Sequence, residues 1–165
     1  MSNREFDIIV WGATGFTGQL VVEYLVETYG VDGELRWAIA GRNRNKLESV
    51  RQSCLADGQH DQLPILIADS NDPDSLATLV QKARVICTTV GPYAKYGTTL
   101  VESCVEAGTH YCDLTGEVQW MARVIPQYQK AAEASGARIV HTCGFDSVPF
   151  DMGNWYLQQV MLERH

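Results

Sequence analysis

The sequence predicts an α/β fold with a doubly wound parallel sheet, and three observations support that class. A mostly apolar, β-branched run, FDIIVW at 6–11, leads into a glycine-rich loop and then into a helical pattern. Similar apolar runs alternate with helical patterns along the rest of the chain, as is typical of parallel α/β proteins. No repeat, low-complexity tract or linker divides the 165 residues, which are enough for one domain with a proper core.

Six strands are expected from short apolar runs that end at turn residues, and they fall at 6–11, 35–40, 65–68, 85–90, 110–114 and 137–143. Helices are expected at about 16–29, 44–56, 98–107 and 117–135, with one more capped by Asp72 and an amphipathic last helix from about Pro149. Right-handed crossovers between such strands predict a sheet in the order 3-2-1-4-5-6. A ligand would then bind outside the carboxyl ends of the strands, between the first and the fourth.

The loop after the first strand carries three glycines, Gly12, Gly15 and Gly18. Gly12 lets the backbone turn where a Cβ would clash, Gly15 lets it approach a diphosphate, and Gly18 lets the helix pack closely. The amides of about Gly15 to Thr17 would be unpaired donors at a helix start, which suits a pyrophosphate. The alternative is a glycine-rich turn without a ligand, since the spacing G-x-x-G-x-x-G departs from the commoner G-x-G-x-x-G.

The residues after the second strand indicate which dinucleotide fits. NAD-binding chains usually hold the ribose 2′-hydroxyl with Asp or Glu there, but this chain has Arg42, followed by Arg44 and Lys46. A guanidinium can bind a 2′-phosphate through two hydrogen bonds, and no carboxylate stands in 38–47 to repel that phosphate. NADP is therefore favoured over NAD as the cofactor. The alternative is a solvated basic turn at a helix start.

Two further loops are expected at the same edge of the sheet. Asp69 follows the third strand, where side chains commonly touch adenine, although an ordinary turn before Asp72 explains it equally well. The segment Gly91-Pro92-Tyr93 follows the fourth strand and should lie beside the ribose and nicotinamide, with the glycine permitting close backbone approach. Tyr93 and Tyr96 would then line the pocket or simply cover the sheet edge.

No catalytic residue is identified from the sequence. His110 and His141 are expected to be structural, because both fall in strands or at their ends. Glu117 is expected to serve a helix start, and Asp146 to lie near the mouth of the site. The chain contains neither a Tyr-x-x-x-Lys pair nor a Gly-x-Ser-x-Gly elbow. The sequence thus favours nucleotide binding over any particular chemical step.

Composition and charge argue against several function classes. The net charge of −7 argues against nonspecific binding to nucleic acid or to an anionic membrane. No apolar run approaches the ~18 residues of a membrane span, and the polar N-terminus resembles neither a signal nor a transit peptide. Five cysteines without a C-x-x-C indicate free thiols in a reducing compartment, so a cytoplasmic protein is expected. The spacing of His and Cys predicts no metal site.

Five segments taken together point to one family. They are VWGATGFTG (10–18), AGRNRNKL (40–47), VGPYAKYG (90–97), THYCDLTGE (109–117) and CGFDSVPFDMG (143–153). In this order, across nearly the whole chain, they resemble the saccharopine dehydrogenase-like oxidoreductases, which include trans-acting enoyl reductases. The resemblance implies a Rossmann domain and NAD(P)-linked oxidoreduction. It implies pyrophosphate binding by Gly12, Thr14, Gly15, Phe16, Thr17 and Gly18, 2′-phosphate binding by Arg42, and a nicotinamide-side role for Gly91, Pro92 and Tyr93.

Members of that family continue into a second domain that supplies much of the substrate pocket and the dimer contacts. The resemblance therefore implies that residues 1–165 are the NAD(P)-binding domain alone, inactive without the second domain, and that the full-length form is a homodimer. The expected function is hydride transfer between nicotinamide and an unidentified small or acyl substrate. The alternative is a non-catalytic NADP(H)-binding sensor or scaffold, because no proton donor is evident.

Overall fold

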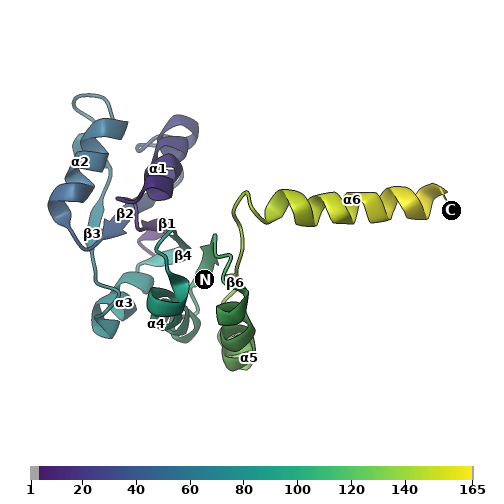
Figure 1. The fold of residues 1–165 in the computed structure, drawn as a ribbon. Coiled ribbons are helices and arrows are strands. Elements are labelled where there is room, and N and C mark those ends of the chain that lie inside the picture. Colours follow the sequence, from purple (N-terminus) through teal and green to yellow (C-terminus); the bar gives the residue numbers. More distant parts are fainter. Residues whose placement is uncertain (1–3, 165) are drawn as a thin grey trace.

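The computed structural model describes residues 4–164 and contains a six-stranded parallel sheet. Its strands are β1 (Phe6–Trp11), β2 (Trp37–Gly41), β3 (Ile65–Ile67), β4 (Ala83–Thr88), β5 (His110–Asp113) and β6 (Ile139–Val140). They lie in the order β3-β2-β1-β4-β5-β6, with β1 paired to both β2 and β4 (Figure 1). The predicted fold class and strand order are confirmed.

The helices are α1 (Phe16–Tyr29), α2 (Arg44–Cys54), α3 (Pro73–Val80), α4 (Tyr93–Ala107), α5 (Val118–Ser135) and α6 (Val148–Arg164), with a short 3₁₀ turn η1 (His60–Gln62). Two cores lie on the two faces of the sheet. Ile9 packs in the core formed with α3, α4 and α5, whereas the next residue, Val10, packs in the core formed with α1 and α2. Both side chains are fully buried, which explains why β1 reads as a continuous apolar run.

Side-chain caps fix the starts of two helices. The Asp72 carboxylate accepts hydrogen bonds from the amides of Asp74 and Ser75, with Pro73 in the first turn of α3. The side chain of Asn43 accepts from the amide of Lys46 and so begins α2 directly after β2. The cap predicted at Asp72 is confirmed.

Helix α4 begins at Tyr93, whereas the sequence pattern predicted a loop as far as residue 97. The prediction was wrong because the cap comes from a distant residue. The Glu117 carboxylate accepts hydrogen bonds from the amides of Tyr93 and Ala94, at 2.6 Å and 2.9 Å. Gly97 then lies inside the helix against the ring of Trp120, where a Cβ would come within 2.7 Å.

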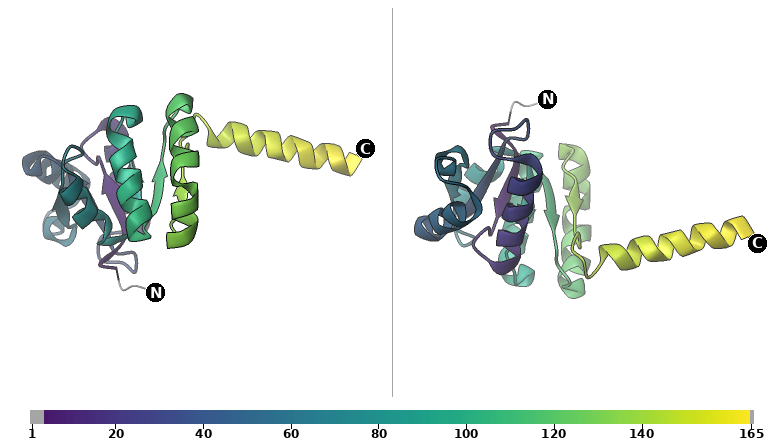
Figure 2. Two further views of the ribbon diagram at one scale, coloured as in Figure 1. Left: turned by 90° about the horizontal axis from the view of Figure 1, so that it is seen from below. Right: turned by 90° about the horizontal axis from the view of Figure 1, so that it is seen from above.

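The chain leaves the sheet after a short β6. Strand pairing was expected through residue 143, but Thr142 has a φ of 60° and the amide of Cys143 donates to the carbonyl of Asp113. Helix α6 follows and extends away from the sheet in every view (Figures 1 and 2). It has no buried residue, and Phe150, Trp155 and Leu157 are among its exposed side chains. The expected amphipathic pattern is therefore absent, although the helix itself forms.

Within residues 4–164, no helix has the length and apolar character needed to cross a bilayer.

Candidate functional site

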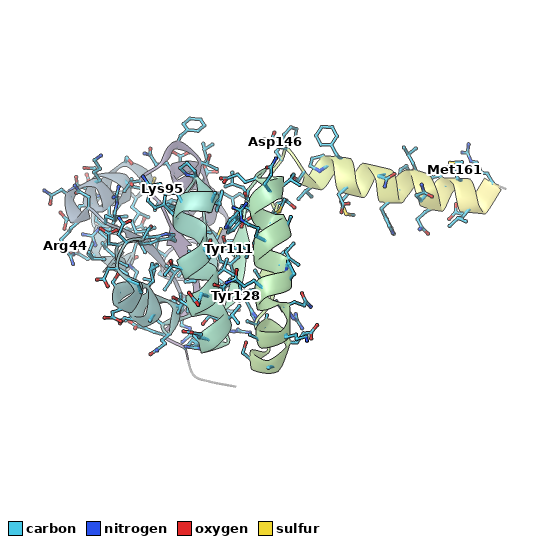
Figure 3. The ribbon with its side chains drawn as sticks, turned by 60° about the horizontal axis from the view of Figure 1, so that its bottom comes forward. Arg44, Lys95, Tyr111, Tyr128, Asp146 and Met161 are labelled. Atoms are coloured by element: carbon cyan, nitrogen blue, oxygen red, sulfur yellow. The ribbon has the colours of Figure 1, made fainter. Side chains whose placement is uncertain are left out.

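A cavity of about 340 Å³ opens at the carboxyl ends of the central strands. Its wall combines the start of α1 (Thr17 and Val21), the ends of β4 and β5, and the loop 143–147 after β6. Asp146 lies in that loop, at the base of α6 (Figure 3). The cavity therefore occupies the edge of the sheet at which the topology predicted a ligand.

The geometry of the β1–α1 loop depends on two of its glycines. Gly12 has a φ of +92°, and a Cβ there would lie 2.5 Å from Val90 Cγ2. A Cβ on Gly18 would lie 2.2 Å from the carbonyl oxygen of Gly12 and 2.9 Å from Ala13 Cα, both of them backbone atoms. The predicted role of Gly18 in close helix packing is confirmed.

Gly15 differs from these two, because a Cβ there would meet only the Gly12 carbonyl oxygen at 3.5 Å, an ordinary contact. The fold itself therefore does not require glycine at this position. The Gly15 amide donates to Gly12 at 3.0 Å, so the prediction that this amide is free was wrong. In the described part of the chain, the amides of Phe16, Thr17 and Gly18 have no hydrogen-bond partner. The start of α1 thus offers three backbone N–H donors that a ligand could bind.

Thr14 and Phe16 flank this helix start. The Thr14 carbonyl accepts a hydrogen bond from Gln19 Nε2 at 3.3 Å, and Phe16 projects its ring into solvent.

Arg42 follows directly after β2 and is exposed. Between residues 4 and 164, its guanidinium has neither an ion pair nor a hydrogen bond. The nearby Lys46 lines a shallow hollow together with Thr14 and Gln19, so a basic side chain faces the same region as the glycine loop. Two exposed basic side chains, Arg42 and Lys46, thus lie at the start of α2, and the 2′-phosphate contact of Arg42 stays a prediction.

Asp69 is engaged in a local turn after β3. One of its carboxylate oxygens accepts from the amide and the side chain of Asn71, at 2.9 Å and 3.0 Å. Ser75 links this turn to α3 by donating to the carbonyls of Asp69 and Asp72. These contacts match the ordinary-turn interpretation, and the adenine contact stays a prediction.

In the segment after β4, Gly91 and Pro92 are exposed at the sheet edge, whereas the Tyr93 side chain is 5% exposed. The Tyr93 hydroxyl donates to the carbonyl of Thr88 and accepts from the amide of Leu114, and its ring stacks on Trp120. Burial raises the pKa of Tyr93 to about 12. The Tyr93 side chain therefore belongs to the core, and none of Gly91, Pro92 and Tyr93 lines the cavity. The nicotinamide-side role of this segment stays a prediction.

Asp113 ends β5 and is the most highly bonded side chain at this edge. Its side chain is fully buried, and the carboxylate accepts four hydrogen bonds: from Tyr111 Oη (2.8 Å), His141 Nδ1 (2.7 Å), and the amides of Thr115 (3.1 Å) and Thr142 (3.0 Å). Burial alone would raise the pKa of Asp113, but these hydrogen bonds together hold it below its ordinary value. A buried carboxylate thus ties β5 to the segment that follows β6.

The partners of Asp113 form a buried network under α5. The His141 ring meets the rings of Tyr111 and Trp120 edge-on, at 5.8 Å and 5.1 Å between centroids. Burial and the adjacent Asp113 charge raise the pKa of Tyr111 well above its ordinary value, so its hydroxyl stays a donor. Figure 3 shows Tyr111 between α4 and α5.

Sequence reasoning missed Asp113, although a carboxylate at the end of an apolar strand was a usable signal. It also predicted that Glu117 serves only the start of the helix that follows it, whereas its carboxylate caps α4. The structural roles expected of both histidines are confirmed: His110 Nδ1 accepts from the amide of Arg138, and His141 pairs with Asp113. Over residues 4–164, no group of three His, Cys, Asp or Glu side chains is arranged to hold a metal ion.

Comparison with known proteins identifies similar sequences. The family model for the saccharopine dehydrogenase NADP binding domain matches residues 8–140. A Mycobacterium tuberculosis relative, provisionally named a trans-acting enoyl reductase, is 46% identical over 160 residues, which cover 97% of this chain and 37% of that protein. A trans-acting enoyl reductase of Mycobacterium leprae is 42% identical, with the same coverage of 97% and 37%. The chain therefore spans well under half the length of these relatives.

Solved structures share the fold. An apo saccharopine dehydrogenase (L-Glu forming) from Saccharomyces cerevisiae superposes with a TM-score of 0.68 at 15% identity, over 86% of this chain and 28% of that one. A Citrobacter triphenylmethane reductase complexed with NADP(H) gives a TM-score of 0.58 at 20% identity, over 82% of this chain and 48% of that one.

Proposed function

We propose, from the premise that the chain belongs to the saccharopine dehydrogenase NADP binding domain family, that it is the cofactor-binding part of a reductase acting on enoyl groups. NADP is the cofactor of this family. The enoyl substrate class is suggested by the names of the two mycobacterial relatives. The chain would contribute NADPH binding and orientation to a protein with the length of those relatives.

The observation that carries the proposal is the start of α1. Three amides that have no partner among residues 4–164 follow Gly15, where the fold leaves space for a ligand to approach. Partial positive charge at a helix start and close backbone access together suit a pyrophosphate. Gly12 and Gly18 shape the loop, and Thr14, Gly15, Phe16 and Thr17 would line it.

The remaining contacts are assigned from the order of the loops along the carboxyl edge of the sheet. Arg42, assisted by Lys46, would bind the 2′-phosphate, and Asp69 would lie at the adenine edge. Gly91 and Pro92 would flank the nicotinamide end, and the cavity between α1 and the loop 143–147 would receive the reacting ring. Bound NADPH supplies a hydride from nicotinamide C4. The chain's own residues would hold that ring and exclude water from one side of it.

The decisive experiment is a calorimetric titration of this chain with NADPH and with NADH. Replacing Arg42 by Ala should weaken NADPH binding by about 1.5–3 kcal/mol, roughly 10- to 150-fold, because a charged hydrogen-bonding partner of the phosphate is lost. NADH binding should change little. The Arg138→Ala variant is the matched control, since Arg138 is exposed at the opposite end of the sheet.

Two results would contradict parts of the proposal. If Arg42→Ala weakens NADH and NADPH equally, Arg42 does not select the cofactor. The enoyl substrate class is tested separately by following nicotinamide absorbance when the full-length protein is mixed with NADPH and an enoyl thioester. Tight NADPH binding without turnover of enoyl, imine or keto substrates would support the sensor or scaffold alternative.

A further inference from the structure

Three of the five cysteines line the same cavity. Cys87 on β4, Cys112 on β5 and Cys143, three residues after the end of β6, all contribute to its wall together with Thr17 and Val21 of α1. The other two cysteines lie elsewhere: Cys54 ends α2, and Cys104 is buried within α4. The thiols are thus concentrated where the nicotinamide end of the cofactor is proposed to lie.

Cys87 and Cys112 are register partners on neighbouring parallel strands. Register partners of this kind point to the same face of the sheet, and neighbouring strands are about 4.8 Å apart. A disulfide requires a Cα separation of about 4.4–6.8 Å. The two thiols can therefore be joined with only a small adjustment of the strands.

The two thiols also differ in character. The neighbouring Cys112 thiol lowers the pKa of Cys87, whereas the neighbouring Cys87 thiol and burial raise the pKa of Cys112. Cys143 is the exposed thiol of the three, whereas Cys87 and Cys112 are partly buried. Because the thiolate is the reactive form, the lowered pKa supports Cys87 as the attacking thiol.

We propose that Cys87 and Cys112 form a redox-modification site in the cavity wall, which a hydroperoxide converts to a disulfide. The Cys87 thiolate attacks the hydroperoxide, so that an S–O bond forms while the O–O bond breaks, and the released oxygen leaves as water or an alcohol after taking up a proton. The Cys112 sulfur then attacks the Cys87 sulfenic acid, forming the S–S bond and releasing water. Two electrons pass from the thiols to the peroxide.

The disulfide has a consequence for the cofactor, and this part rests on the proposed function. A dinucleotide in the cavity covers both thiols, and a disulfide changes the wall against which the nicotinamide packs. Bound NADP⁺ and the disulfide therefore disfavour each other. By linkage, the factor by which NADP⁺ opposes the disulfide equals the factor by which the disulfide weakens NADP⁺ binding.

The first experiment tests the thiol pair without cofactor. The reduced chain is treated with hydrogen peroxide, and its disulfides are mapped by mass spectrometry. We expect a Cys87–Cys112 linkage that dithiothreitol reverses and that survives the Cys54→Ser control. In Cys112→Ser, dimedone should trap a sulfenic acid on Cys87. A linkage through Cys143, or oxidation of Cys54 at the same rate, would overturn the assignment.

The second experiment tests the coupling. Saturating NADP⁺, which has no hydride to donate to the oxidant, should shift the dithiol–disulfide equilibrium in a glutathione buffer by at least about fivefold toward the dithiol. The oxidised chain should bind NADP⁺ more weakly by the same factor. An unchanged equilibrium with NADP⁺ bound would overturn the coupling. Failure of the reduced chain to bind NADP⁺ would overturn the proposed function, while the mapped disulfide would still support the thiol pair.

Discussion

The two sides of the candidate site, at the β1–α1 loop and at the ends of β4 to β6, are built in different ways. At the β1–α1 end, the shape depends on backbone: a positive φ at Gly12, the missing Cβ of Gly18 and free amides at the start of α1. At the β4–β6 end, the shape depends on side chains, chiefly the Asp113 carboxylate with its four hydrogen bonds and the Glu117 cap on α4. The first end is local in sequence, whereas the second joins residues far apart.

This difference suggests that the β1–α1 end binds the ligand and that the β4–β6 end stabilises the fold. Within residues 4–164, the β1–α1 end leaves backbone amides without hydrogen-bond partners, while at the β4–β6 end the protein itself supplies the hydrogen bonds to the Asp113 carboxylate. We infer that substitutions at the second end act mainly on stability and those at Gly15 act mainly on binding. The following predictions test that separation, from the largest expected effect to the smallest.

The largest effect is expected for Asp113→Ala. Removing a buried carboxylate leaves His141, Tyr111 and two amides without their acceptor, which typically costs about 3–5 kcal/mol of unfolding free energy. Chemical denaturation measures this cost, and Asp113→Asn, which keeps the size and one acceptor oxygen, should lose less. A loss below about 1 kcal/mol for the alanine variant would mean that the β4–β6 end does not depend on this side chain.

The contribution of Asp113 to stability should also depend on pH. Because the pKa of Asp113 is lower in the folded chain than the ordinary value of 3.8, its contribution is fully present above that value. The contribution is lost as the pH falls from 3.8 through the folded-state pKa. Denaturation across this acid range should therefore show a steeper loss for the natural chain than for Asp113→Asn. Parallel curves would contradict the assignment.

At the glycine loop, the contrast is between Gly18→Ala and Gly15→Ala. A Cβ on Gly18 meets backbone atoms at 2.2 Å and 2.9 Å, so the loop must move, and we expect a loss of about 1–3 kcal/mol. A Cβ on Gly15 has space within the protein, so stability should stay within about 0.5 kcal/mol, yet NADPH binding should weaken because the backbone no longer approaches the pyrophosphate.

Calorimetric titration and denaturation of the two variants make this comparison, with Gly153→Ala as a control at a glycine of α6 that has open space around it and lies outside the cavity wall. If Gly15→Ala binds NADPH as tightly as the natural chain while remaining folded, the pyrophosphate assignment is wrong.

The smallest effect is expected for Glu117→Ala. Loss of the cap leaves the amides of Tyr93 and Ala94 without their acceptor, and losing a helix cap typically costs about 1 kcal/mol. Glu117→Gln retains one acceptor and should lose less. Glu23→Ala, an exposed position on α1, controls for removal of a surface carboxylate. Equal losses in Glu117→Ala and Glu23→Ala would show that the cap contributes nothing.

The same difference between local and distant contacts explains which features could be predicted from the sequence. The strand order and the role of Gly18 were predictable, because apolar runs and required glycines leave a local pattern. The early start of α4 was not, since its cap lies 24 residues away at Glu117. The Asp113–His141 contact spans 28 residues, so the position of Asp113 at the end of an apolar strand does not reveal its partner.

Tyr93 shows how a local pattern can also predict the wrong environment for a side chain. A tyrosine beside an exposed Gly-Pro turn suggests a pocket residue, but the α4 cap rotates it into the core against Trp120. Its position is thus decided by tertiary contacts, which periodicity does not record.

Helix α6 has a consequence for how the chain unfolds. Its side chains bury nothing against the sheet, so its hydrogen bonds are held only by the intrinsic helix–coil balance, which is marginal for an isolated segment of this length in water. The amide protons of α6 should exchange with solvent through local fraying, while those of β1 exchange only when the whole sheet opens. The cooperative unit of this chain is therefore the sheet with α1 to α5, and α6 melts outside it.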